Sequence, residues 1–104
     1  MFGWFLDTDL HATTGQPHND IGSDFDVQVA YTPGSGWTGQ VFDTAAEEGF
    51  DIDTYEVNEG MVSMWLPLSA LGGPSAFHWI AITLEGDQYR DIAPNEEHVE
   101  STLP

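Results

Sequence analysis

The chain has 104 residues, 40% of them hydrophobic, with 18 acidic side chains, one basic side chain (Arg90) and no cysteine. A formal net charge of −17 excludes binding to nucleic acid or to an anionic membrane surface, because both need many cationic contacts to phosphate. The length and the blocks of apolar residues predict one globular domain over residues 1–104. No apolar run is long enough to predict membrane insertion.

Charge this extreme has two compatible interpretations. The excess of carboxylates repels itself and weakens the folded state unless cations screen it. The chain is therefore expected either to bind divalent cations specifically or to be adapted to a salty, halophilic-like environment. The start of the chain has no signal-peptide pattern, and the absence of cysteine says nothing about the redox compartment.

The first predicted element is the apolar strand "FGWFL", and "FHWIAITL" within residues 76–85 is similar to it. Both segments are apolar on the two faces that a strand presents. One interpretation makes them central strands of a sheet that is covered on both sides. The other makes one of their faces a ligand platform or a subunit interface, because large aromatic side chains on an outer face mark contact sites.

The stretch "FLDTDLHATTG", residues 5–15, places Asp7 and Asp9 at the end of the first strand and on the same side of it. The following turn returns Asp20 and Asp24 towards the next strand. Carboxylates, carbonyls and waters are the ligands that calcium prefers, so Asp7, Asp9, Asp20 and Asp24 are candidate metal ligands. Spacing alone leaves solvated loop acids as the alternative, and it excludes an EF-hand loop.

Alternation with a period of two predicts a strand at 24–31, followed by a turn and a hairpin partner at 36–42. Further predicted strands cover 50–57 (with a slip near Thr54), 61–67, 76–85 and 88–94. The helix-like patch at 43–49 and a non-strand connection at 68–75 interrupt this pattern, and residues 95–104 are either a loose tail or an edge strand. Strands at this spacing predict an all-β, antiparallel β-sandwich of jelly-roll type.

Other residues give weaker indications of a metal site, of catalysis or of ligand binding. His11 and His18 share a loop with Asp9 and Asp20, so a mixed zinc site is conceivable, although no zinc motif is present. No nucleophile elbow, P-loop or dinucleotide motif occurs, and carboxylate pairs carry little information among 18 acids. We therefore expect no enzyme activity and assign no catalytic residue. Aromatic rings can stack on sugar faces, which makes a set of aromatic residues candidates for carbohydrate binding: Trp37, Trp65, Trp79 and Tyr89.

The segment "FLDTDLHATTG…IGSDFDVQV" resembles the strand–loop–strand region of secreted β-sandwich domains similar to family-nine carbohydrate-binding modules and DOMON-like domains. The segments "LPLSALGGPSAFHW" and "YRDIAPNEEH" are similar to later parts of that pattern, in the same order. The resemblance implies a structural calcium at Asp7, Asp9 and Asp24, an extracellular or cell-surface location, and binding of carbohydrate or surface attachment.

The chain departs from this family in one respect, since the family usually has several strands before the Asp-x-Asp strand. Missing strands would leave an uncovered edge or face, which folded proteins rarely tolerate. Either the sequence is truncated at its N-terminus, or another subunit supplies the cover. The apolar strands fit the second explanation, so we expect self-association into a homo-oligomer, with Trp4, Trp65 or Trp79 at an interface. The alternative function is a structural subunit that builds a filament or surface layer through a strand edge or an aromatic face.

Overall fold

The computed structural model describes residues 1–59, 61–85, 88–94 and 97–102, of which 88–90 are described in backbone only. The described chain is all-β and antiparallel, as predicted. Its strands are β1 (Phe2–Asp7), β2 (Gln16–His18), β3 (Ile21–Ser23), β4 (Phe25–Thr32), β5 (Gly36–Asp43), β6 (Glu48–Ile52), β7 (Tyr55–Asn58), β8 (Met61–Met64), β9 (Ala76–Glu85), β10 (Gln88–Ala93) and β11 (Val99–Thr102). A 3-10 helix, η1 (Leu68–Leu71), precedes β9.

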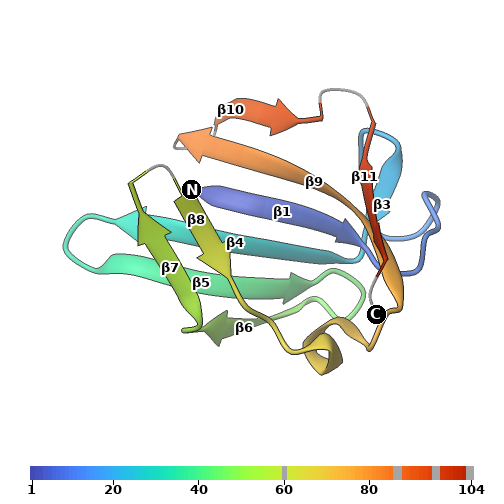
Figure 1. Ribbon diagram of the computed structural model, residues 1–104, viewed down its shortest axis with the longest axis horizontal. Coiled ribbons are helices and arrows are strands. Elements are labelled where there is room, and N and C mark those ends of the chain that lie inside the picture. Colours follow the sequence, from blue (N-terminus) through green and yellow to red (C-terminus); the bar gives the residue numbers. More distant parts are fainter. Residues whose placement is uncertain (60, 86–87, 95–96, 103–104) are drawn as a thin grey trace.

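One large sheet organises the molecule. Its strand order is β10-β9-β1-β4-β5-β6, and β11 also pairs with β9 (Figure 1). The hairpins β2–β3 and β7–β8 form two further sheets of two strands each within the described residues. The antiparallel all-β class is thus confirmed, whereas the jelly-roll sandwich stays a prediction.

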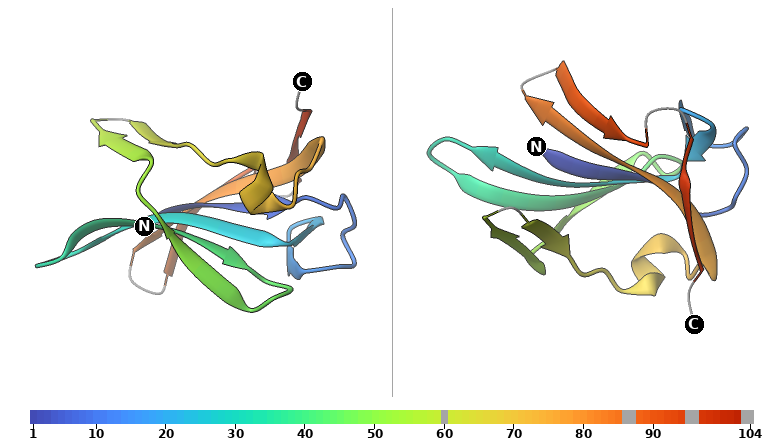
Figure 2. Two further views of the ribbon diagram at one scale, coloured as in Figure 1. Left: turned by 90° about the horizontal axis from the view of Figure 1, so that it is seen from below. Right: turned by 45° about the horizontal axis from the view of Figure 1, so that its top comes forward.

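The two apolar strands of the sequence lie at the centre of this sheet. Strand β1 lies between β4 and β9, with Trp4 opposite Val27 on one side and Ala81 on the other. The left view of Figure 2 shows the large sheet nearly edge-on, with the segment from β7 to η1 on one side of it and β2–β3 towards the other. The interpretation of these segments as central, doubly covered strands agrees with this arrangement.

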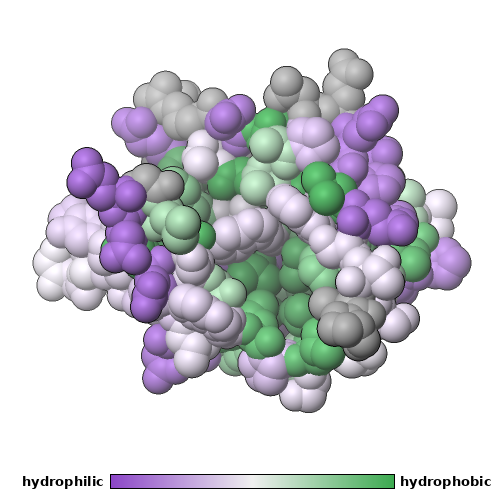
Figure 3. Space-filling view, viewed as in Figure 1, coloured by the Kyte–Doolittle hydropathy of each residue, from purple (hydrophilic) through white to green (hydrophobic). Residues whose placement is uncertain are grey.

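The two faces of the large sheet carry separate hydrophobic clusters. We call one the β3 face, because Phe5, Ile80 and Ile82 are buried there with Ile21 of β3. We call the other the β8 face, because Met64 of β8 packs there against a cluster that includes the buried side chains of Leu6, Val27 and Val41. Figure 3 looks onto the β8 face and shows a depression with a hydrophobic floor.

The predicted strand positions are largely confirmed. The strands predicted at 24–31, 36–42 and 76–85 correspond to β4, β5 and β9 with shifts of no more than one residue at either end. The strand predicted at 61–67 is shorter, because β8 ends at Met64. Within the final stretch, β11 pairs with β9.

The segment predicted as one strand at 50–57 is instead divided between β6 and β7. The break falls at Thr54, where the slip was expected. The Thr54 hydroxyl donates to the carbonyl of Trp65 at 2.6 Å, and the Trp65 N–H donates back to the Thr54 carbonyl at 2.8 Å. This exchange draws the chain away from the edge of the sheet and starts the hairpin β7–β8.

The predicted helix-like patch at 43–49 is wrong. Residues 44–47 form a turn, because Asp43 Oδ1 accepts the N–H groups of Ala45 and Ala46 at 3.0 and 3.1 Å. A side chain that satisfies backbone donors in this way offers the chain an alternative to a helix. Glu47 then takes a positive φ of 55°, and β6 begins at the next residue.

Candidate metal centre and aromatic cleft

Three of the four predicted metal ligands meet where β1 ends and β4 begins. The carboxylates of Asp7, Asp9 and Asp24 each offer an oxygen, and these oxygens all lie within 4.8 Å of one another. The backbone fixes this proximity, since the N–H of Asp24 donates to the carbonyl of Leu6 at 2.8 Å. No other group of three or more acidic or histidine side chains in the described ranges is close enough to share an ion.

Asp7 is the least exposed carboxylate of the three, with only 1% of its surface accessible. One of its oxygens, Oδ2, accepts the N–H of Gly22 in a long contact of 3.4 Å. The other, Oδ1, is buried and has no hydrogen-bond partner among the described residues. Burial, reinforced by the neighbouring Asp9 and Asp24, raises the pKa of the Asp7 carboxyl. A buried carboxylate oxygen without a donor is costly unless a cation or a proton compensates it.

The other two carboxylates are held in fixed orientations. Asp24 Oδ2 accepts the N–H groups of Thr8 and Asp9 at 3.0 and 3.2 Å, and burial raises the pKa of Asp24. Asp9 accepts the hydroxyl of Thr14 and the N–H of His11, and the Thr14 bond is the main reason that the pKa of Asp9 is lowered. The site is therefore preformed by the loop that connects β1 to β2.

Two glycines allow this loop to pack on β3. A Cβ atom on Gly22 would lie 1.7 Å from the carbonyl oxygen of Thr14, and one on Gly15 would lie 2.2 Å from that of Ser23. Gly15 also has a φ of +76°, which glycine adopts without strain. The small residues of the sequence motif thus bring the loop against β3, which ends immediately before Asp24.

The structure does not bring Asp20 into this group. Its carboxylate instead contacts Nδ1 of His98 at 2.9 Å, because the turn between β2 and β3 carries it towards the C-terminal segment. The hypothetical zinc site is not formed either. His11 is exposed, while the ring of His18 stacks on Phe5 with centroids 3.6 Å apart.

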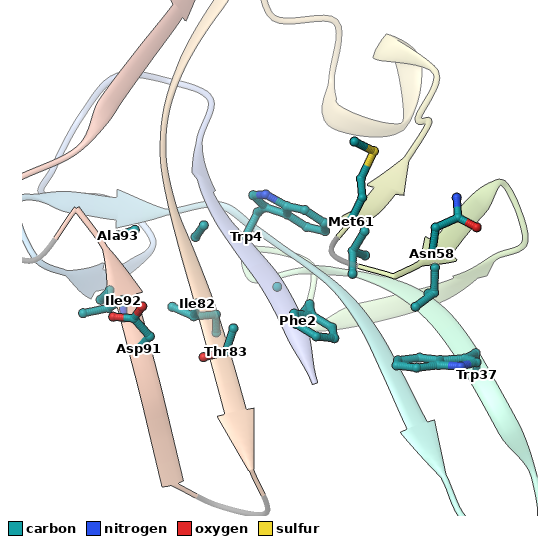
Figure 4. A pocket seen from close by; sticks show the side chains of 14 residues that line it. Phe2, Trp4, Trp37, Asn58, Met61, Ile82, Thr83, Asp91, Ile92 and Ala93 are labelled. Carbon is teal, nitrogen blue, oxygen red and sulfur yellow. The ribbon is translucent and has the colours of Figure 1, made fainter.

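A cleft of about 510 Å³ lies at the opposite end of β1. Figure 4 shows Phe2 and Trp4 of β1 and Trp37 of β5 facing Asn58 and Met61 at the tip of the β7–β8 hairpin. Polar groups line the cleft at three positions: Asn58, Thr83 and Asp91. Large rings with a few polar groups are typical of a site that binds a small amphipathic ligand.

Trp37 is the most accessible of the three large aromatic side chains in the cleft, with 38% of its surface exposed. Its ring lies 6.3 Å from Phe2 and 5.3 Å from Tyr31, centroid to centroid. The hydroxyl of Tyr55 donates to the Trp37 carbonyl at 2.9 Å and ties β7 to β5 at this point. The sequence-predicted candidate Trp37 therefore lies on a wall that is held by hydrogen bonds and aromatic contacts.

The remaining aromatic candidates lie elsewhere. Trp65 is 56% exposed on the connection after β8. Trp79 is half-buried, donates to Ser101 Oγ at 3.0 Å and lines a separate apolar hollow of about 340 Å³, which shares Trp4 with the cleft. The side chain of Tyr89 lies outside the described residues.

Sequence reasoning missed Asn58, Met61 and Asp91 as cleft residues. Asn58 and Met61 flank the turn of β7–β8, and they face Trp4 only because that hairpin crosses the sheet. No local pattern in the sequence encodes this crossing. Two signals in the sequence pointed to the cleft: the apolar character of "FGWFL" on both faces and the selection of Trp37 as a candidate for carbohydrate binding.

No family model matches the chain, and no curated protein or solved structure is detectably similar to it. Within the described ranges, no helix is long and apolar enough to cross a membrane.

Proposed function

We propose that this chain is a non-catalytic, calcium-stabilised β module of the extracellular type, and that its aromatic cleft binds carbohydrate. The observation that supports the calcium site best is the buried Oδ1 of Asp7, which has no hydrogen-bond donor among the described residues, in a carboxylate that lies beside those of Asp9 and Asp24. An acidic cluster alone would carry little weight on a chain of net charge −17.

The ligand atoms available at this site favour a hard cation. Every side-chain atom that could ligate a metal in the group of Asp7, Asp9 and Asp24 is a carboxylate oxygen. Calcium accepts six to eight oxygen ligands in flexible geometry, so loop carbonyls and waters would complete its coordination. Its two positive charges would offset the repulsion that Asp7 experiences from Asp9 and Asp24.

Thermal and urea unfolding with calcium and with chelator test this site. Calcium at ~100 times its Kd should raise the free energy of unfolding by about 2.7 kcal/mol, because it binds only the folded state. The variant Asp7→Asn should lose this gain. Without calcium at neutral pH it should be more stable than the wild type, because it removes a buried, uncompensated charge.

Two controls make the calcium experiment specific. Asp20→Asn removes an acidic side chain of the same loop region that contacts His98 instead of the cluster, so its calcium response should equal that of the wild type. Sodium chloride at matched ionic strength measures general screening of the negative charge. An equal calcium response in Asp7→Asn and the wild type would contradict the assignment.

Carbohydrate is the ligand class that the cleft fits best. The rings of Phe2, Trp4 and Trp37 offer flat apolar surfaces, while Asn58, Thr83 and Asp91 offer hydrogen-bonding groups at the rim. A sugar presents apolar ring faces beside hydroxyl groups, so it matches both kinds of surface. With only Arg90 as a basic side chain, anionic ligands are disfavoured and neutral sugars are favoured. The resemblance to carbohydrate-binding modules points to the same class.

Titration of tryptophan fluorescence with neutral oligosaccharides, guided by a glycan array, tests this proposal. Trp37→Ala should weaken binding at least tenfold, since it removes an exposed ring that lines the cleft. Trp65→Ala is the matched control, because Trp65 is exposed but does not line the cleft. Equal losses in both variants, or no binding of any sugar by the wild type, would refute carbohydrate binding at this place.

Self-association is the second candidate function, and the edge strand β6 favours it. Strand β6 ends the large sheet, and Phe50 within it is 41% exposed. An exposed edge with an apolar side chain is a template for pairing with a like chain. Light scattering across protein concentrations distinguishes the candidates, because growth without sugar supports assembly and a monomer that binds sugar supports the module.

A further inference from the structure

The aromatic cleft and the apolar hollow are consecutive parts of one trough on the β8 face. Phe2, Trp4 and Leu6 alternate along β1, so their side chains share this face of the sheet. Of the two cavities, Phe2 lines only the cleft, Leu6 lines only the hollow, and Trp4 lines both. Four residues of a strand span about 13 Å, so the trough has room for an elongated ligand that passes over Trp4.

Strand β8 follows the trough along its side. Met61, at the start of β8, lines the cleft, whereas Met64, at its end, lines the hollow. The mutual hydrogen bonds between Thr54 and Trp65, at 2.6 and 2.8 Å, hold the chain next to Met64. The cleft and the hollow therefore have a common floor in β1 and a common wall in β8.

Hydrogen-bonding side chains lie at one end of this trough. Asn58, Thr83 and Asp91 line the cleft. The hollow, over the described residues, is lined by leucine, valine, methionine, phenylalanine and tryptophan side chains alone. The indole N–H of Trp79 is already used, because it donates to Ser101 Oγ at 3.0 Å. A ligand that fills both parts must therefore be polar at one end and apolar at the other.

The hollow is open to solvent although its lining is apolar. Leu66, Phe77 and Trp79 are half-buried, and Leu68 is 46% exposed. Apolar side chains gathered in this way mark a binding site, because covering them removes apolar surface from water. The volume of about 340 Å³ is within the range of small-molecule pockets, which is about 300–1,000 Å³.

We propose that the hollow binds the alkyl chain of a neutral glycoside whose sugar lies in the cleft. The proposal rests on carbohydrate binding in the cleft and narrows the ligand to an amphiphilic glycoside. Trp4, which lines both parts, would contact the junction of sugar and chain. The net charge of −17 and the carboxylate of Asp91 in the cleft disfavour fatty acids and other anionic amphiphiles, in agreement with an uncharged sugar as the polar end.

Calorimetric titration of the wild type with methyl, butyl, hexyl and octyl glucosides and maltosides, each below its critical micelle concentration, tests the proposal. Burial of one methylene group strengthens binding up to about fourfold, so the octyl glycosides should bind at least tenfold more tightly than the butyl glycosides. The probe 1-octanol carries the chain without a sugar. It should bind at least tenfold more weakly than octyl maltoside.

The outcomes separate this proposal from the one on which it rests. Equal affinity for all chain lengths, with the sugar bound, would overturn the hollow as a binding site and leave carbohydrate binding in the cleft intact. Equal affinity for 1-octanol and the octyl glycosides would show that the sugar contributes nothing, and it would overturn both proposals. Absence of binding by every probe would overturn the glycoside assignment.

Two variants with the same charge change test whether the hollow holds the chain. Leu68→Asp places a carboxylate in the lining of the hollow at an exposed position, where the fold tolerates it. It should weaken octyl glycoside binding at least tenfold and leave methyl glycoside binding unchanged, because the chain would desolvate the carboxylate. Trp65→Asp is the matched control, since Trp65 is 56% exposed and lines neither part of the trough. Equal losses in both variants would contradict the proposal.

Nuclear Overhauser effects in the wild type keep the test decisive if a variant fails to fold. Chain protons of bound octyl maltoside should show contacts with the rings of Phe77 and Trp79, and its sugar protons should show contacts with Trp37. Chain contacts with Trp37 alone, or with none of these rings, would overturn the assignment of the chain to the hollow. Sugar contacts with Trp37 would in that case still support the cleft.

Discussion

The two faces of the large sheet are covered in different ways, although both carry a hydrophobic cluster. On the β3 face, Ile21 of a short hairpin closes over Phe5, Ile80 and Ile82, all of which are buried. On the β8 face, the floor is buried but the walls are half-exposed, and they line the cleft and the apolar hollow. The hydrophobic cluster of the β3 face is therefore closed to solvent, whereas the β8 face gives a ligand access.

Changing the glycine that closes the loop should give the largest effect. In Gly22→Ala the new Cβ would meet the Thr14 carbonyl at 1.7 Å, so the loop must move away from β3. We expect a loss of about 3 kcal/mol or more in urea unfolding, at the upper end of the cost of overpacking. Gly34→Ala is the control, because its Cβ would enter open space and the positive φ alone costs about 1 kcal/mol. Similar losses in the two variants would contradict this account of the loop.

Truncation of one side chain on each face compares the loss of unfolding free energy at the closed β3 face with the loss at the open β8 face. Ile80→Ala removes a side chain that is 0% exposed on the β3 face, and it should cost about 2–5 kcal/mol. Leu66→Ala removes a half-buried wall residue of the apolar hollow, and it should cost about 1 kcal/mol. The measurement is chemical unfolding of both variants under the same conditions. A larger cost for Leu66 would reverse the roles assigned to the two faces.

A smaller, pH-dependent effect should come from Asp7, beside those of Asp24 and Asp26, whose pKa values are also raised by burial. Burial raises the pKa of Asp7 in the folded state, so the folded chain binds a proton more tightly than the unfolded chain. In calcium-free protein, this group's contribution to the free energy of unfolding therefore falls as pH rises from the ordinary aspartate value to the raised one. Asp7→Asn should flatten that slope. An unchanged slope in unfolding experiments from pH 3 to 7 would show that Asp7 does not cause it.

Local patterns predicted much of the strand layout. Alternation identified β4 correctly, because one face of this strand lies on a core and a period of two is then sufficient. The turn after it identified β5 as the hairpin partner. The same pattern could not show that β6 and β7 separate at Thr54, since that depends on hydrogen bonds to Trp65, eleven residues away. The hairpin β2–β3 was missed because its strands have only three residues each.

The candidate site was predictable where the chain itself brings residues together. Asp7 and Asp9 are close in sequence, and Asp24 follows from the return of the loop. Asp20 was grouped with them by the same reasoning, yet its partner His98 comes from the other end of the sequence. Contacts over such separations leave no trace in local spacing.

The pairing of both β10 and β11 with β9 limits how copies of this chain could associate by their backbones. Two short strands share one side of β9, so that margin of the sheet is interrupted. It offers a second chain no long continuous row of backbone N–H and C=O groups. Strand β6 alone forms the far margin, as a single row of five residues. Backbone association would thus join two molecules margin to margin through β6 and then stop, because a growing fibre needs two usable margins on every molecule.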